Sequence, residues 1–272
     1  MPHYPSAVHS LRRVFMQAFV VHDITEPLVS FDDFAPTDKV KELMGAGNYE
    51  VVGIRRAGRI EGYLDVAEIE SGVCGDCMKP FEHAQVILNT EPLPELVRRL
   101  RDQRRLFVST FGRIGGIVSR SDLDKPPVRM WLFGMVTLIE MRFTRLIERY
   151  CSEDEWKTCL SAGRIEKADQ LLRERDRRNQ NVALLDCLQL SDKLQIVARN
   201  KALQELTRFQ SRRQVEQMAK KLEKLRNNLA HCQTIVTDDW ETILALSENL
   251  DNVLDRTHAD EADRNGIARD ES

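Results

Sequence analysis

Residues 224–233 read KLRNNLAHCQ and bring an arginine, two asparagines and a histidine into one short stretch. Asparagine and histidine are poor helix formers, yet the residues before them have the composition of a long helix. A histidine titrates near neutral pH and can give or take a proton, while an arginine presents a planar cation to phosphate oxygens. The pattern therefore indicates either proton-transfer chemistry beside a phosphate or a polar contact across a dimer interface.

A helical wheel separates these polar residues from an apolar stripe. The stripe alternates steps of three and four residues, at Val215, Met218, Leu222, Leu225 and Leu229. At about 100° per residue, four polar residues lie roughly 140° to 200° from Leu222. They are Lys220, Lys224, Asn227 and His231. Arg226 lies on the shoulder of the stripe, where a long side chain can still reach outward. We expect all five on an outward surface.

Charge is unevenly distributed in a chain whose formal net charge is only −3. Residues 199–226 contain nine basic residues and three glutamates, whereas residues 248–272 contain eight acids and three arginines. The basic segment indicates either a phosphate-facing surface or an ordinary solvated face. We expect the acidic end, residues 257–272, to be a disordered tail.

The apolar runs and the cysteines bear on where the chain resides. The longest uncharged apolar run, 130–139, has ten residues, whereas about 20 are needed to cross a bilayer. We expect this run to be a buried helix or an oligomer interface, and no contact with a membrane. The N-terminus does not read as a secretory signal, and six irregularly spaced cysteines fit reduced thiols. We therefore expect a cytoplasmic protein.

One CxxC motif raises the question of a metal site. Cys74 and Cys77 form this motif, and His83 follows nearby. A structural zinc ion normally needs four ligands, and no second CxxC or CxxH follows. We predict no metal site and interpret both cysteines as small apolar residues of a connecting segment.

The first half of the sequence contains an internal repeat. Residues 58–65 read GRIEGYLD and residues 112–119 read GRIGGIVS, an offset of 54. Upstream, residues 23–27 and 76–80 share the pattern Asp-x-x-x-Pro. Units of about 50 residues rarely fold alone, so we expect the two copies to pack together.

Each copy has the pattern of a small α/β unit. A short amphipathic helix is predicted at 38–44 and again at 94–101, and the strand after it at 50–54 and 105–109. A glycine turn then leads to a second strand, and a helix start follows at Val66 or Ser121.

This repeated unit resembles the CBS (cystathionine-β-synthase-type) domain, which occurs in tandem pairs, and the resemblance covers about residues 18–125. It divides the chain into an extension at 1–17 and two CBS repeats at 18–71 and 72–126. In that family each motif ends with Gly-φ-x-Ser/Thr-x-x-Asp. The hydroxyl contacts a nucleotide phosphate, and the carboxylate binds the ribose hydroxyls, usually of an adenosine ligand.

Only the second repeat retains the whole signature. Its residues are Gly116, Ser119 and Asp122. The resemblance implies that they bind a regulatory adenine nucleotide, such as ATP, AMP or S-adenosylmethionine. The first repeat has Gly62, Asp65 and Glu68 at these positions, and an acid in place of the hydroxyl would repel a phosphate. We expect one nucleotide site, in the second repeat; the alternative is a ligand-free dimerisation scaffold.

Beyond the Pro126-Pro127 pair the sequence has almost no strand pattern, and we predict a bundle of four or five helices over 127–256. The helices are expected at 128–150, 153–177, 182–197, 200–233 and 238–255. Asp238 to Glu241 has the pattern of a capping box for the last of them. The predicted fold class is thus α/β followed by all-α.

In this helical context, Arg226 to His231 resembles the R-x4–6-H signature of HEPN domains, helical bundles found in many RNA-cleaving toxins and defence proteins. Asn227 matches the polar residue that the family favours after the arginine. The resemblance implies a metal-independent endoribonuclease in which the motif helices of a homodimer meet. His231 would transfer protons, Arg226 would stabilise phosphate charge, and Asn227 would orient His231 or the phosphate. Lys220 and Lys224 would hold the RNA backbone.

These resemblances predict an adenine-nucleotide sensor whose CBS pair regulates cleavage of RNA by its own 2′-hydroxyl in a homodimer. Catalysis would need no cofactor, and DNA is not an expected partner. The helix at 128–150 would link nucleotide binding to the bundle. The alternative is a non-catalytic nucleotide sensor that regulates a protein partner through its helical domain.

Overall fold

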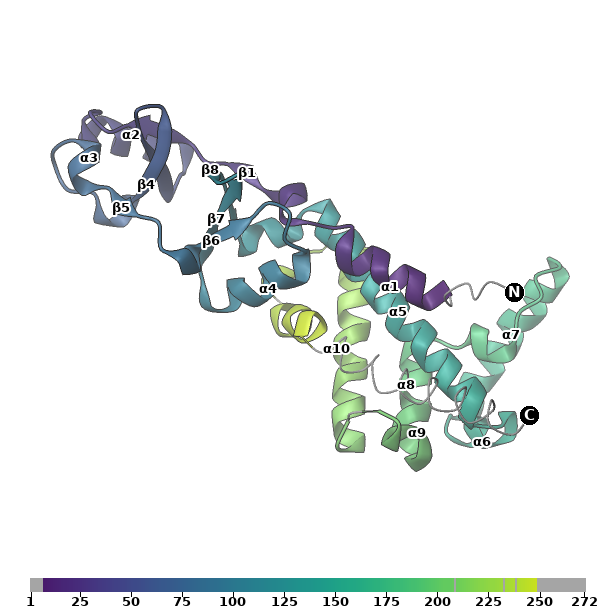
Figure 1. Ribbon diagram of the computed structural model, residues 1–272. Helices are drawn as coiled ribbons and strands as arrows, with labels where there is room; N and C mark the ends of the chain where they lie inside the picture. Colours follow the sequence, from purple (N-terminus) through teal and green to yellow (C-terminus); the bar gives the residue numbers. More distant parts are fainter. Residues whose placement is uncertain (1–6, 208, 232, 238, 249–272) are drawn as a thin grey trace, which may run out of the picture. The chain divides into compact units, whose positions relative to one another are not determined.

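The computed structural model describes residues 7–207, 209–231, 233–237 and 239–248 (Figure 1). The chain divides into two compact units, Met16–Val128 and a second that combines Met1–Phe15 with Arg129–Ser272. The first unit holds two small sheets, and every regular element in the described part of the second is helical. An α/β region followed by a helical region is therefore confirmed.

The two repeats of Met16–Val128 have the same order of elements. The first contains β2 (Ser30–Asp32), α2 (Thr37–Gly47), β3 (Val51–Arg56) and β4 (Arg59–Asp65). The second contains β6 (Val86–Leu88), α4 (Leu93–Asp102), β7 (Arg105–Thr110) and β8 (Arg113–Ser119). In both, the last two strands form an antiparallel hairpin, and the leading strand pairs parallel to the next. The predicted repeat is confirmed.

The two hairpins turn through matched residues with positive φ. These angles are 48° at Ala57 and 74° at Gly58, and 50° at Phe111 and 75° at Gly112. A two-residue turn with positive φ at both positions suits the right-handed twist of the flanking strands, and glycine adopts it without strain. The glycine turns predicted from the sequence are thus confirmed.

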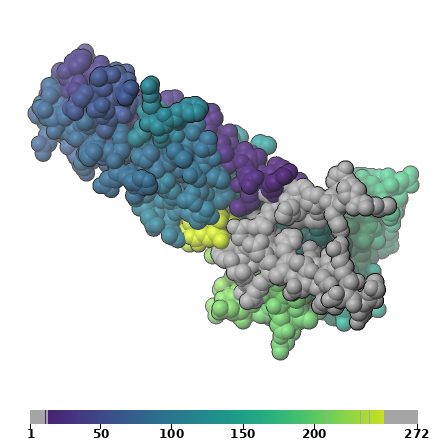
Figure 2. Space-filling view, in the orientation of Figure 1, coloured from purple at the N-terminus to yellow at the C-terminus, as the bar shows by residue number. Residues whose placement is uncertain are grey.

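The segment at the start of each repeat completes the sheet of the other repeat. β1 (Glu26–Pro27) pairs with β8, and β5 (Lys79–Pro80) pairs with β4, which gives the strand orders β1-β8-β7-β6 and β2-β3-β4-β5. The Asp-x-x-x-Pro segments are therefore exchanged between the repeats. Figure 2 shows the two repeats as adjoining surfaces, the first in purple to blue and the second in blue to teal.

Close contact between the exchanged strands requires glycine. A Cβ atom added to Gly116 would overlap the Thr25 side chain, and one added to Gly62 would overlap the Lys79 carbonyl oxygen. The glycine that both repeats carry at this position is thus explained by the close approach of the exchanged strand. The helix starts expected at Val66 and Ser121 are short 3-10 turns, η2 (Val66–Glu68) and η4 (Arg120–Asp124).

The CxxC motif lies on the short α3 (Cys74–Cys77), at the start of the second repeat's segment, and packs against the first repeat. Cys74 is fully buried in the cluster that includes Val40, Met44 and Leu64. Burial, followed by the neighbouring Cys77, raises the pKa of the Cys74 thiol. No group of three or more potential metal ligands is found in the described part of the chain.

The second unit is built from helices. They are α1 (Ala7–Gln17), α5 (Pro126–Tyr150), α6 (Glu153–Thr158), α7 (Ala162–Arg177), α8 (Leu190–Arg199), α9 (Lys201–Glu205) and α10 (Arg212–Ala230). The last residues of α1 and the first residues of α5 belong to Met16–Val128. α5 confirms the helix predicted at 128–150 and buries Trp131, Leu132 and Met135 completely. A partly buried ion pair, with 3.0 Å between Lys193 Nζ and Glu140 Oε1, joins α8 to α5. No described helix could cross a membrane.

Three predicted helices were too long. The helix at 200–233 is interrupted between α9 and α10, where the Ser211 side chain accepts a hydrogen bond from the Gln214 amide and starts a new helix. The helix at 153–177 breaks at residues 159–161, and the one at 182–197 is a 3-10 turn, η5 (Leu184–Cys187), followed by α8. At Asn200 before α9 and at Ser211 before α10, the side chain of a polar cap residue competes with helix continuation.

The capping box predicted at Asp238 to Glu241 is wrong. Residues 236 and 237 are already helical, and the Asp239 amide donates to the Ile235 carbonyl oxygen as in a helix interior. Residues 239–248 are helical as well. Asp238 itself, the remainder of the predicted helix to 255 and the tail at 257–272 lie outside the described residues.

Candidate functional site

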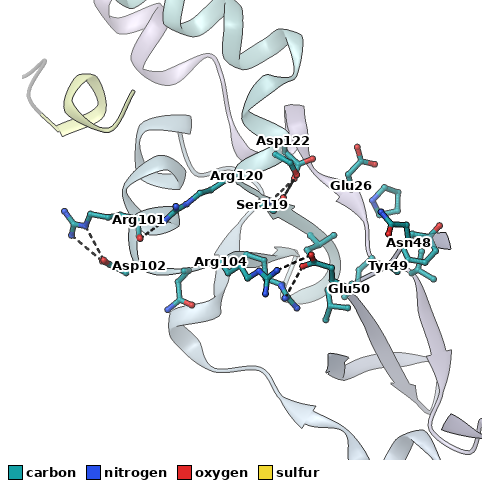
Figure 3. Close-up of a pocket in the computed structure, with 18 residues that line it drawn as sticks. Glu26, Asn48, Tyr49, Glu50, Arg101, Asp102, Arg104, Ser119, Arg120 and Asp122 are labelled. Carbon is teal, nitrogen blue, oxygen red and sulfur yellow. Dashed lines mark hydrogen bonds and ion pairs between the residues drawn. The ribbon is translucent and has the colours of Figure 1, made fainter. Parts of the chain in front are cut away.

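A pocket of about 970 Å³ opens in Met16–Val128, between the ends of strands from both repeats (Figure 3). Segments 26–29, 48–51, 101–105 and 119–122 line it, together with Ile117. Apolar side chains such as Leu28, Val51 and Ile117 supply part of its wall, and hydroxyl, acidic and arginine side chains supply the rest. A mixed lining of this kind suits a ligand with one flat apolar part and one polar part.

Ser119 and Asp122 lie together at the end of β8 (Figure 3). The Asp122 Oδ2 atom accepts hydrogen bonds from the Ser119 amide at 2.7 Å and the Ser119 hydroxyl at 3.0 Å. The Ser121 hydroxyl lies 2.8 Å from that of Ser119. Two hydroxyls and one carboxylate thus share a wall of the pocket. Gly116 does not line the pocket and instead admits Thr25 of the exchanged segment.

The arginines that line the pocket are tied to neighbouring groups. Arg104 Nη2 lies 3.2 Å from Glu50 Oε1, and Figure 3 shows these side chains directed toward each other. Arg120 donates hydrogen bonds to the carbonyl oxygens of Leu100 and Arg101 at the end of α4. Arg104 is largely exposed, so its guanidinium can exchange Glu50 for a ligand phosphate with little loss.

The matched position in the first repeat is closed by ion pairs. Asp65 Oδ2 lies 2.9 Å from Arg105 Nη1, and the exposed fractions of the two side chains are only 23% and 13%. The other Asp65 oxygen accepts a hydrogen bond from the Ala67 amide. Glu68 forms an ion pair with Lys79 of β5. Asp65 and Glu68 of the first repeat are therefore both paired with cationic side chains of the protein.

The motif helix α10 has the two faces expected from the sequence. Its apolar residues Val215, Leu222, Leu225 and Leu229 are buried. The five candidate residues Lys220, Lys224, Arg226, Asn227 and His231 are all exposed. His231 is the C-cap of α10, with φ −100° and ψ 12°, so it follows the last helical residue rather than lying within the helix. The outward placement of these residues is confirmed.

Sequence reasoning missed the role of Asn228. This residue is 7% exposed, and its Nδ2 atom donates a 2.6 Å hydrogen bond to Oδ2 of Asp239, which is 2% exposed. Arg129 Nη2 donates to the carbonyl oxygens of Asn228 and Gln233, at 3.0 and 2.9 Å. An arginine at the carboxyl end of a helix satisfies terminal carbonyls and opposes the helix dipole. No local pattern pairs Asn228 with either partner.

No protein-family model matches this chain, and no curated protein matches it. Solved structures similar to it include the CBS-pair protein CBSX2 from Arabidopsis thaliana, with 18% identity and a TM-score of 0.34 over 39% of this chain and 91% of that one. CBSX2 in complex with AMP has 20% identity and the same TM-score, over 39% and 93%.

The CBS domain of a bacterial CNNM/CorC family Mg²⁺ transporter is also similar, at 17% identity and a TM-score of 0.34, over 44% of this chain and 81% of that one. Such matches lie in the N-terminal part of the chain, and the motif helix α10 is outside them. These three solved structures are CBS-pair proteins or a CBS domain.

Proposed function

We propose that Met16–Val128 binds an adenine nucleotide in the pocket beside Ser119. The observation that carries this proposal is the cluster of two hydroxyls and the Asp122 carboxylate on one wall of a pocket of about 970 Å³. When the Ser119 hydroxyl turns to donate to a phosphate, as Ser121 can too, it no longer donates to Asp122, whose carboxylate then has lone pairs for the ribose hydroxyls. Arg104 would add a cation, and the apolar wall near Leu28 would hold the base.

Titration calorimetry on the full chain tests this site with AMP, ATP and S-adenosylmethionine. Ser119→Ala should weaken the preferred ligand about tenfold, because a hydrogen bond to a charged group contributes about 1.5–3 kcal/mol. Glu68→Gln is the matched control, since Glu68 holds the position of Asp122 in the first repeat and should leave affinity unchanged. If none of the three ligands binds the wild-type chain, the nucleotide proposal is wrong.

The helical unit is proposed to cleave RNA without a metal ion. Arg226, Asn227 and His231 are exposed at the carboxyl end of α10. Lys224 and Lys220 are exposed about one and two turns before Asn227. His231 would take the proton from the 2′-hydroxyl or give one to the leaving 5′-oxygen, and a second copy of the motif would perform the other step. Arg226 would stabilise the charge on the phosphate, and Asn227 would orient His231 or the phosphate.

Regulation follows if nucleotide binding changes how two protomers face each other. A homodimer would bring two His231 side chains to one cleft, and the nucleotide would favour one dimer arrangement over another. This coupling requires two arrangements with different affinities for the nucleotide. Toxin or defence proteins of the HEPN type are the functional class that this proposal extends to this chain, with RNA as the substrate in the cytoplasm.

The packing of Asn228 favours a second candidate function. One polar residue of the motif is already used to fix α10 to the following helix, so the motif has a structural role independent of catalysis. In this alternative the chain is a non-catalytic nucleotide sensor, and the exposed face of α10 binds a protein partner.

One experiment separates the two. The full chain is incubated with a structured RNA in EDTA, with and without AMP, ATP or S-adenosylmethionine. Cleavage that disappears in His231→Ala and persists in His83→Ala, which replaces an exposed histidine of the other unit, supports the nuclease. Intact RNA under every condition supports the non-catalytic sensor, and cleavage that survives His231→Ala rejects the assignment of His231.

A further inference from the structure

Lys125 joins three groups around the wall of the pocket. It follows η4 directly and precedes α5, and its side chain is 28% exposed. The Nζ atom lies 2.6 Å from the Ile24 carbonyl oxygen and 2.9 Å from Asp122 Oδ1, and it also bonds to Glu26 Oε1. The ammonium group therefore uses its three protons on one carbonyl and two carboxylates.

This arrangement sets the local charge of the pocket. Glu26 and Asp122 both line it, and each brings a carboxylate to the region where a nucleotide would lie. Burial lowers the pKa of Lys125, but hydrogen bonds to Glu26 and Asp122 outweigh it and leave that pKa above its ordinary value. Lys125 therefore stays protonated at neutral pH. Without it, two carboxylates would face an anionic ligand with no cation between them.

In the first repeat the acid that corresponds to Asp122 is neutralised by a different lysine. The register of the exchanged strands matches Glu26, opposite Ile117, with Lys79, opposite Tyr63. In the first repeat this lysine pairs directly with Glu68, the counterpart of Asp122. In the second repeat the exchanged strand brings another acid, so the neutralising cation has to come from a third position.

We infer that Lys125 is a specificity-determining positioning residue of the nucleotide pocket. It holds the Asp122 carboxylate beside Ser119 and offsets the charge of Glu26, so that the pocket accepts a ligand bearing a phosphate. Lys125 acts through these acids and needs no contact with the ligand. The inference rests on the proposed nucleotide site and adds that its preference for phosphate depends on this residue.

The test compares AMP with adenosine, which lacks the phosphate. Calorimetry on the full chain should show that Lys125→Met weakens AMP binding about tenfold while adenosine binding changes less than about threefold, because only AMP meets the uncovered carboxylate charge. Lys125→Arg keeps the cation and should restore AMP affinity to within about threefold of the wild type.

A charge-restoring variant gives a second, independent readout. Glu26→Gln combined with Lys125→Met removes one acid together with the lysine, so the local net charge equals that of the wild type, and AMP affinity should recover. Thermal unfolding verifies that each variant is folded, and if Lys125→Met is not, the double variant and Lys125→Arg decide the matter.

Three results have distinct meanings. An AMP-to-adenosine affinity ratio that is unchanged in Lys125→Met, or a double variant that does not recover AMP binding, overturns the role of Lys125. Loss of both ligands in equal measure shows a structural role alone and also overturns it. Failure of the wild-type chain to bind either ligand instead rejects the nucleotide site itself.

Discussion

The two repeats carry different side chains at one structural position, the last residue of their second hairpin strand. In the first repeat this residue is Asp65, paired in the ladder with Val51, and in the second it is Ser119, paired with Arg105. The Arg105 side chain contacts the other repeat, because its guanidinium forms an ion pair with Asp65 of the first repeat. The counterpart of that contact, between Val51 and Ser119, would join an apolar side chain to a hydroxyl.

This difference bears on which of the two positions can accept a ligand. A carboxylate and a guanidinium satisfy each other and exclude a ligand, since breaking a partly buried ion pair leaves an uncompensated charge. A valine and a serine do neither, and Val51 and Ser119 both line the pocket, which Arg105 also lines. Two copies of one fold thus diverge through the charge of two positions rather than through a change in backbone.

The largest effect is expected when the second repeat is given the acid that the first repeat has at this position, Asp65. Ser119→Asp should weaken AMP binding by about 100-fold, because the hydroxyl donor is lost and a carboxylate is placed beside Asp122 and the ligand phosphate. Titration calorimetry on the full chain measures the change. Ser119→Thr, which keeps the hydroxyl, is the control and should bind AMP within about fivefold of the wild type. Equal affinities for Ser119→Asp and the wild type would remove Ser119 from the site.

The repeat could be predicted from the sequence because its turns and strands have local sequence patterns. The pairs Ala57-Gly58 and Phe111-Gly112 occupy identical turns, and the alternation around them indicates two hairpins. The exchange of β1 and β5 was not predictable in the same way. β1 pairs with β8 some 90 residues away, and β5 pairs with β4 through only two residue pairs, so neither pairing leaves a periodic signal in its segments.

The helical unit shows the same limit. The outward face of α10 followed from its period, because the buried stripe is a local pattern. The break before α10 depends on Ser211 as a cap, and a serine within a polar run gives a weak signal on its own. The bonds from Asn228 to Asp239 and from Arg129 to Asn228 join three helices, so they could be found only from the folded structure.

A second prediction concerns the two glycines that admit the exchanged strands. A Cβ at Gly62 would overlap the backbone oxygen of Lys79, which can move only with β5, whereas a Cβ at Gly116 would first meet the side chain of Thr25. Gly62→Ala should therefore lower the free energy of unfolding by about 2–3 kcal/mol, and Gly116→Ala by about 1–2 kcal/mol. Urea denaturation of both variants measures the difference. Gly115→Ala is the control, since a Cβ there meets nothing within 4 Å. The opposite order of the two losses would contradict the exchanged-strand explanation.

The smallest expected effect comes from converting the first site into a copy of the second. Arg105→Val alone should lower the free energy of unfolding by about 2 kcal/mol, because Asp65 keeps its charge at 23% exposure and loses its partner. Asp65→Ser combined with Arg105→Val reproduces the valine and serine of the other repeat and should recover more than half of that loss, since no unpaired acid remains. A double variant no more stable than Arg105→Val would show that the arginine acts through its packing rather than its charge, and the comparison between the repeats would then rest on shape instead of electrostatics.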